Sequence, residues 1–357
     1  MINNHQILKV LKTALVIRLV LLLLSGNALL LQTAHAQVFV PEQQVIVAVI
    51  DEGVDFSHPV LKNKAWQNLK EIPENGLDDD RNGYIDDING WNFLDKNKNL
   101  SIQGSHGTKL AGIIAGEKNS KNGFEGVSSD AVIMSLIVCR QNYGCEQSGI
   151  IQAIYYAVDN GARVINLSLG DTSGYKKDYD QAILYAYERN VVIVASSGNS
   201  PVGYSLAEEP MSPICNDNGK NMVLGVGTVD EKGVRPSWAN FGGCIDISAK
   251  GTKVFAPVPR QHSASLYEEV DGNSYATAYA SGVVAALVKK EPKLLASQVI
   301  SRLHTNATGK NFTVSLSRTL SDQYAIERAV KPQVKVIPGT TKPKILAQNK
   351  AIKLVIR

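Results

Sequence analysis

Residues 45–53 read Val45-Ile46-Val47-Ala48-Val49-Ile50-Asp51-Glu52-Gly53, an apolar run followed by two acids and a glycine. A continuous stretch of mostly β-branched side chains, closed by a turn signal, is typical of a strand buried on both faces of a parallel sheet. Such a strand would place Asp51 at its carboxyl end. Because parallel sheets bind ligands beyond the carboxyl ends of their strands, this acid is a candidate functional residue.

Similar apolar runs alternate with helical patterns along most of the chain. Further strands are predicted at 131–138, 164–169, 191–195, 221–229 and 245–248, and helices at 106–116, 148–160, 175–190 and 275–290. Alternating strands and helices favour βαβ units whose helices cover both faces of one sheet. The predicted fold class is therefore α/β, a three-layer α/β/α sandwich around a mainly parallel sheet.

The composition is that of a globular protein, with 44% hydrophobic and 20% charged residues among 357. The formal net charge of +4 comes from the two ends, because residues 1–36 carry three positive charges and residues 331–357 carry seven, without any acid. This leaves a net charge of −6 for residues 37–330. A mildly acidic body with a basic tail does not match the basic surface of a nucleic-acid-binding protein.

The first 36 residues have the pattern of a secretory signal peptide. Basic residues precede the apolar run 19–24, and Ala34-His35-Ala36 is a small-x-small cleavage signal before Gln37. The alternative is an uncleaved membrane anchor over 13–31, but a basic residue and an asparagine interrupt that stretch. We therefore expect export with cleavage of the signal peptide.

All four cysteines follow the predicted cleavage site. An even number of cysteines in an exported chain indicates disulfides, most simply Cys139–Cys145 and Cys215–Cys244 among three connectivities. Zinc binding is disfavoured because neither pair has the short spacing of a zinc knuckle. The cysteines therefore agree with an oxidising compartment.

Three residues with complementary chemistry each lie in a glycine-flanked turn: Asp51, His106 and Ser274. A hydroxyl nucleophile needs an imidazole to take its proton and a buried carboxylate to hold that imidazole in the right tautomer. Ser274 lies just before the predicted helix 275–290, and a helix N-terminus stabilises negative charge. Each residue alone could be a capping or surface residue, but their joint occurrence in this order favours a hydrolytic triad.

Five segments in chain order resemble those of the subtilisin-like serine proteases. Residues 47–53, 104–108 and 272–277 resemble the three active-site signatures of that family. Residues 166–170 resemble the strand that pairs with extended substrate, and residues 195–199 resemble the segment that carries an oxyanion-hole asparagine. The resemblance implies a subtilisin-like fold and a peptidase that needs no cofactor for its chemistry.

The resemblance also implies a role for individual residues. Ser274 would be the nucleophile, His106 the general base and then acid, and Asp51 the residue that orients His106. The side chain of Asn199 and the backbone N–H of Ser274 would stabilise the oxyanion. The implied substrate-binding residues are Ser168, Leu169, Gly170, Ser196, Ser197 and Gly198.

The chain departs from the family pattern at three positions. Glu52 stands where the family has Thr or Ser, and a second carboxylate there would raise the pKa of Asp51 if it pointed inward, or have no effect if it faced water. Tyr275 replaces Met and Ala278 replaces Pro in the helix after Ser274. Because Ala is a good helix former, we expect this helix to persist.

An acidic loop between Asp51 and His106 has the spacing of a calcium loop. Oxygen-bearing side chains occur at its first, third, fifth and ninth positions, with a glycine at the sixth, and a backbone carbonyl is available at the seventh. The predicted ligands are Asp78, Asp80, Asn82, Tyr84 through its carbonyl, and Asp86. The alternative is an Asx-rich surface turn without an ion. We expect structural calcium, because several carboxylates this close repel one another without a cation.

Together these observations predict an exported subtilisin-like serine endopeptidase that acts on a protein or peptide substrate. The expected organisation is a signal peptide at 1–36, a peptidase domain at 37–330 and a basic tail at 331–357. We expect a monomer in the secreted, periplasmic or cell-envelope fraction, with no nucleic-acid partner and no membrane span after signal cleavage. One alternative is a processing protease dedicated to one exported partner. Another is a non-catalytic calcium-dependent binding protein on the same scaffold.

Overall fold

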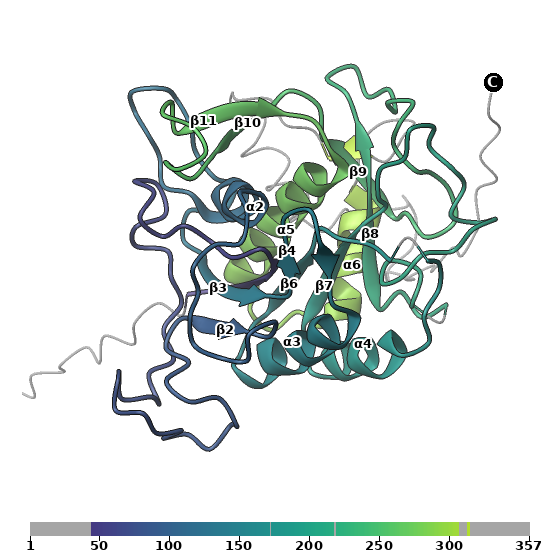
Figure 1. Ribbon diagram of the computed structural model, residues 1–357. Helices are drawn as coiled ribbons and strands as arrows, with labels where there is room; N and C mark the ends of the chain where they lie inside the picture. Colours follow the sequence, from purple (N-terminus) through teal and green to yellow (C-terminus); the bar gives the residue numbers. More distant parts are fainter. Residues whose placement is uncertain (1–43, 172, 218, 307–312, 315–357) are drawn as a thin grey trace, which may run out of the picture. The chain divides into compact units, whose positions relative to one another are not determined.

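The core of the computed structural model is an eight-stranded sheet (Figure 1). The structure describes residues 44–171, 173–217, 219–306 and 313–314. The strand order is β12-β9-β8-β7-β6-β1-β3-β2, and every neighbouring pair is parallel. The strands are β1 (Ile46–Asp51), β2 (Gly90–Asn92), β3 (Val132–Ile137), β6 (Val164–Leu167), β7 (Val192–Ser196), β8 (Val223–Val229), β9 (Ile247–Lys250) and β12 (Thr313–Val314).

Alternate residues of the sheet enter two separate hydrophobic clusters. Val47 and Val49 of β1 pack with side chains from α2 (His106–Ala115), α5 (Asn273–Lys290) and α6 (Ala296–Asn306). Ala48 and Ile50 pack with side chains from α3 (Gln147–Asp159) and α4 (Tyr179–Glu188). Successive strand residues point to opposite faces, so a run that is apolar at every position can bury both. The predicted three-layer α/β/α fold is confirmed.

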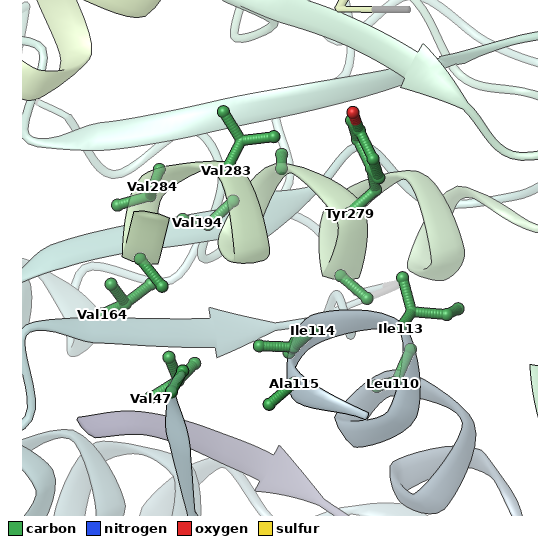
Figure 2. Close-up of a cluster of buried hydrophobic side chains, with 14 of the residues drawn as sticks. Val47, Leu110, Ile113, Ile114, Ala115, Val164, Val194, Tyr279, Val283 and Val284 are labelled. Atoms are coloured by element: carbon green, nitrogen blue, oxygen red, sulfur yellow. The ribbon is translucent and has the colours of Figure 1, made fainter. Parts of the chain in front are cut away.

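The face under α2 and α5 carries mostly β-branched and small side chains. Figure 2 shows valines from three neighbouring strands, Val47, Val164 and Val194, packed with Val283 and Val284 of α5. All five are at most 2% exposed. This packing holds α5 against the sheet and thereby fixes the position of its first turn.

Several elements differ from the sequence-based expectation. Helix α5 begins at Asn273 with Gly272 as its N-cap residue, so Ser274 lies inside the first turn rather than ahead of the helix. Helix α4 begins at Tyr179 rather than at 175, because Lys176 instead bonds to Ser212 through its backbone N–H (2.7 Å) and to Asn216 through its carbonyl (2.9 Å).

Some elements were not predicted at all. They are the hairpin β10 (Val254–Pro257) and β11 (Tyr267–Val270), the short pair β4 (Cys139–Arg140) and β5 (Gly144–Cys145), strands β2 and β12, and helix α6. The strands among them have two to four residues each, too few to show a period in the sequence.

Both predicted disulfides are confirmed. Cys139 is bonded to Cys145 across β4 and β5, and Cys215 is bonded to Cys244. The predicted signal peptide and basic tail lie outside the described residues. None of the described helices is long and apolar enough to cross a membrane.

Candidate active site

The carboxyl ends of β1, β6 and β7 and the N-terminal ends of α2 and α5 meet at one edge of the sheet (Figure 1). The strands are neighbours in the order β7-β6-β1, so the residues that follow them emerge side by side. Asp51 ends β1, and His106 and Ser274 occupy the first turns of the two helices.

Asp51 and His106 form a close pair. The Nδ1 atom of His106 lies 2.9 Å from Oδ2 and 3.0 Å from Oδ1 of Asp51, which is 2% exposed. Because a carboxylate only accepts hydrogen bonds, Nδ1 carries the proton and Nε2 is left to accept one. Gly107 permits the approach of α2, since a Cβ there would lie 2.4 Å from the carbonyl oxygen of Gly53.

Glu52 lies against the start of α2. Its Oε2 accepts the backbone N–H of His106 at 3.2 Å, in a helix whose N-cap residue Ser105 makes no side-chain capping bond. Partial burial, together with the charge of Asp51, raises the pKa of Glu52. The two sequence-based alternatives were that the Glu52 carboxylate points inward or faces water. It does neither fully, because it is partly buried and accepts a hydrogen bond from the backbone of His106.

The pKa of His106 reflects opposing effects. Burial of the imidazole lowers its pKa, but the charge and hydrogen bond of Asp51 and the charge of Glu52 raise it. The nearby ammonium of Lys109 opposes these carboxylates, and the net result is a pKa above the usual histidine value. Lys109 itself is paired with Glu268 of β11 at 2.6 Å.

Ser274 is hydrogen-bonded to the segment that follows β6. Its hydroxyl donates to the carbonyl of Ser168 at 3.1 Å, and the hydroxyl of Ser168 donates back to the carbonyl of Ser274 at 3.0 Å. The ring of the next residue, Tyr275, lies 5.9 Å from the His106 ring. To transfer its proton to His106, the Ser274 hydroxyl must exchange the Ser168 carbonyl for Nε2 of the imidazole.

Asn199 is exposed, but a hydrogen bond fixes the orientation of its side-chain amide. Its Oδ1 accepts the backbone N–H of Asn273 at 2.9 Å, one residue before Ser274. This bond turns the carbonyl side of the amide toward α5 and leaves Nδ2 as a donor, 3.8 Å from where a Cβ on Gly272 would lie. A donor in this place can stabilise negative charge that develops on a substrate oxygen.

Asn273, which sequence reasoning missed although it lies inside the motif 272–277, connects the first turn of α5 to the end of β7. It is fully buried, and its Oδ1 accepts the hydroxyl of Ser196 at 3.0 Å and the backbone N–H of Ser197 at 3.1 Å. Its Nδ2 donates to the hydroxyl of Ser197 at 2.5 Å. The side chains of Ser196 and Ser197 are thus engaged in holding α5 rather than turned toward solvent.

The remaining predicted substrate-binding residues differ in exposure. Ser168 is buried, Leu169 and Gly198 are half-buried, and Gly170 is exposed. Gly170 and Gly198 therefore offer backbone surface at the ends of the segments that follow β6 and β7.

The acidic loop, which precedes β2, is arranged differently from the prediction. Asp78 and Asp80 are brought together with Glu71, so that one carboxylate oxygen from each lies within 4.8 Å of the others. Asp86 is not part of this cluster, because Lys98 binds its Oδ2 at 2.7 Å and the backbone N–H groups of Asn75 and Gly76 also bind its carboxylate. Glu71 was missed because it lies outside the repeated spacing of the loop.

The other two predicted calcium ligands are Asn82, whose amide has partners, and Tyr84, whose ring and N–H rather than its carbonyl make the contacts that follow. The amide of Asn82 donates to Asp87 at 2.9 Å and accepts the backbone N–H of Tyr84 at 2.8 Å. The ring of Tyr84 packs edge-on against Trp91 and Tyr156, and Tyr156 donates to Asp87 at 2.6 Å. These contacts fasten the loop to α3.

Comparison with known proteins gives consistent matches. A family model described as "Subtilase family" matches residues 42–326. The chain is 31% identical over 244 residues to a thermophilic serine proteinase of Bacillus sp. (strain AK1), which covers 68% of this chain and about half (52%) of that relative. It is 30% identical over 265 residues to subtilisin DY of Bacillus licheniformis, covering 74% and 84% of the two chains.

The fold is also similar to that of solved structures. A cold-adapted subtilisin-like serine proteinase superimposes with a TM-score of 0.60 and 24% identity, covering 76% of this chain and 84% of that one. At this identity the likeness concerns the fold.

Proposed function

Because the chain belongs to the subtilase family of serine endopeptidases, we propose that it cleaves peptide bonds with Asp51, His106 and Ser274 as its catalytic triad. The observation that carries the proposal is the pair formed by buried Asp51 and His106 Nδ1 at 2.9 Å, at the same sheet edge as Ser274. No cofactor enters this chemistry.

The reaction begins with attack of Ser274 Oγ on the scissile carbonyl carbon. His106 Nε2 takes the hydroxyl proton, and Asp51 stabilises the imidazolium through Nδ1. The tetrahedral intermediate then breaks its C–N bond as His106 returns the proton to the leaving amine. An acyl-enzyme remains on Ser274, and water that is deprotonated by His106 hydrolyses it.

The oxyanion of each tetrahedral intermediate would be held by Asn199 Nδ2 and the backbone N–H of Ser274. The bond from Asn273 N–H to Asn199 Oδ1 supports this role, because it orients the amide before substrate arrives. Donors that are fixed in advance need no reorganisation when the charge develops.

Extended peptide would lie along the backbone of Ser168, Leu169 and Gly170, which continue β6 beyond the sheet. On its other side it would meet the segment from Ser196 to Gly198. This places the substrate between the extensions of two neighbouring parallel strands, where such sheets bind ligands.

We propose calcium as a structural ion for the acidic loop, held by Glu71, Asp78 and Asp80. Three carboxylates with oxygens within 4.8 Å are a hard-oxygen donor set that suits this cation. The ion would offset their mutual repulsion and fix the loop.

We also propose that the domain 37–330 is exported after removal of residues 1–36 and that it acts as a monomer outside the cytoplasm. The sequence pattern before Gln37 and the two disulfides support export. N-terminal sequencing of the protein recovered from an expressing cell's exported fraction should begin at Gln37.

The test of the triad is labelling of the purified protein with a fluorophosphonate probe, which reacts with activated serines. Ser274→Ala should abolish labelling and lower peptide hydrolysis by about 10⁶-fold. Ser237→Ala, a change at an exposed serine, is the matched control and should label normally. A folded wild-type protein that neither labels nor cleaves peptide would contradict the proposal.

A further inference from the structure

Two glycines lie at the ends of the segments between which the proposed substrate binds. Ser274 binds the carbonyl of Ser168, and its neighbour Asn273 binds Ser197, so the nucleophile lies between the extensions of β6 and β7. In the proposed binding mode, a substrate carbonyl attacked there, with its oxygen toward Asn199, would direct the preceding side chain between these extensions. The two glycines are Gly170, in the segment that follows β6, and Gly198, in the segment that follows β7.

The side chain of Met211 already occupies the space between the two glycines. A Cβ placed on Gly170 would lie 2.6 Å from Cε and 2.8 Å from Sδ of Met211. A Cβ placed on Gly198 would lie 3.1 Å from the same Cε and 3.5 Å from the same Sδ. The thioether of Met211 therefore lies against the backbone of both Gly170 and Gly198, and Met211 is only 3% exposed.

The backbone of Met211 is held in place. Its carbonyl accepts the N–H of Cys215 at 3.0 Å, and Cys215 is tied to Cys244 by a disulfide. The next residue, Ser212, accepts the N–H of Asp171 at 2.8 Å, directly after Gly170. The segment that carries Met211 is thus hydrogen-bonded to the segment that ends at Gly170 and Asp171.

The thioether end is also restrained. The hydroxyl of Tyr204 donates to Sδ of Met211 at 3.6 Å. Methionine is a flexible side chain that can repack, but here it would have to leave a buried position and give up this contact.

We propose that Met211 is the specificity-determining residue for the substrate side chain before the scissile bond and limits it to small neutral residues such as Gly, Ala and Ser. This rests on the proposed function, because it assumes that Ser274 attacks a peptide held between the two segments. A large aromatic or charged side chain would have to displace an apolar thioether from between two backbone walls. Differences of one methylene in a filled pocket already change kcat/KM by about 10–200-fold.

The experiment measures kcat/KM of the full chain on fluorogenic peptides that differ only before the scissile bond, with Ala, Leu or Phe. Wild type should prefer Ala over Phe by at least about tenfold. Met211→Gly should raise kcat/KM for Phe by at least about tenfold and leave that for Ala within about threefold. Met211→Leu, which keeps the volume, should retain the preference for Ala.

Met222→Gly is the matched control, because Met222 is 1% exposed but precedes β8 at the amino edge of the sheet. It should cost stability without changing the ratio of Phe to Ala hydrolysis. If Met211→Gly does not fold, the wild-type protein alone provides the test. It is incubated with a denatured protein substrate, and the sites at which that substrate is cleaved are identified by sequencing. Cuts after small residues support the proposal, and cuts mainly after Phe, Tyr or Leu overturn it.

The outcomes separate this inference from the proposed function. Active enzyme that labels at Ser274 but has the same Phe-to-Ala ratio in wild type and Met211→Gly overturns the role of Met211 alone. Protein that neither labels nor cleaves any peptide overturns the proposed function, and the inference falls with it.

Discussion

The first turn of α5 and the acidic loop are both rich in polar groups, but they are stabilised in different ways. At α5, buried Asn273 is satisfied by neutral partners from the end of β7 and the segment after it: Ser196, Ser197 and Asn199. In the loop, Asp78 accepts N–H groups from its own turn, those of Asn82 and Gly83. The first arrangement joins distant parts of the chain, whereas these bonds of Asp78 are local.

The two regions therefore differ in what they require for order. The α5 site needs no added charge, because each buried donor near Asn273 meets an acceptor of the protein. The loop gathers three carboxylates, Glu71, Asp78 and Asp80, within 4.8 Å. Like charges at such distances repel one another, and a cation between them would offset this repulsion. The comparison indicates that the first turn of α5 is ordered by folding alone, whereas the loop would gain order from the cation proposed above.

Asn199→Ala should have the largest effect on the preorganised site. Turnover should fall by about 10²–10³-fold with little change in KM, because the lost donor acts mainly in the transition state. Steady-state kinetics on a single peptide measures this. Asn122→Ala is the control, since Asn122 is exposed and likewise accepts one backbone N–H, that of Phe124. Equal turnover in the two variants would remove Asn199 from the oxyanion hole.

Calcium should stabilise the loop and, through it, the protein. At a free calcium concentration of 100 times the dissociation constant, the free energy of unfolding should rise by about 2.7 kcal/mol over that with chelator. Thermal or denaturant unfolding with and without calcium measures the increment. Glu71→Gln should remove most of it.

Asp86→Asn separates the two ligand sets. It should lower stability with and without calcium, because it breaks the pair with Lys98, yet leave the calcium increment in place. An increment that survives Glu71→Gln but disappears in Asp86→Asn would favour the spacing-based ligands.

Asn273→Ala should destabilise the protein by about 1–3 kcal/mol for each buried partner left without a hydrogen bond. It should also lower turnover, because the first turn of α5 loses its connection to Ser197. Asn75→Ala, at an exposed asparagine of the acidic loop, should change the free energy of unfolding by less than about 0.5 kcal/mol. Denaturant unfolding compares the two, and equal costs would refute the contrast between a buried and a local network.

Glu52→Gln should have the smallest effect, a shift in pH dependence. His106 must be neutral to accept a proton, so activity is lost as the pH falls through its raised pKa. Removing the charge of Glu52 lowers that pKa, and the acid limb of kcat/KM should move to lower pH. Gln keeps an acceptor for the His106 N–H, so the helix start should be preserved. Glu74→Gln, at an exposed position, should leave the limb unchanged, and a shift of Glu52→Gln to higher pH would contradict the account.

Much of the fold was predictable because its signals are local. The apolar run before Asp51 fills both faces of the sheet at successive positions, so its unbroken, mostly β-branched composition and the turn signal after it indicate a buried parallel strand. The disulfide partners Cys139 and Cys145 are close in sequence, which made their pairing the simplest choice. Five segments that include Asp51, His106 and Ser274 indicated the family before any distance was known.

Tertiary structure decided which residues surround those positions. The sequence by itself determined most strands of the sheet, helices α2 to α5 and the candidate triad, because apolar runs, helix signals and motif spacing are properties of neighbouring residues. Only the fold placed Met211 between Gly170 and Gly198, Glu71 beside Asp78, and Asp86 on Lys98. These contacts join residues whose separation carries no pattern, since they depend on the path of the connecting loops through space.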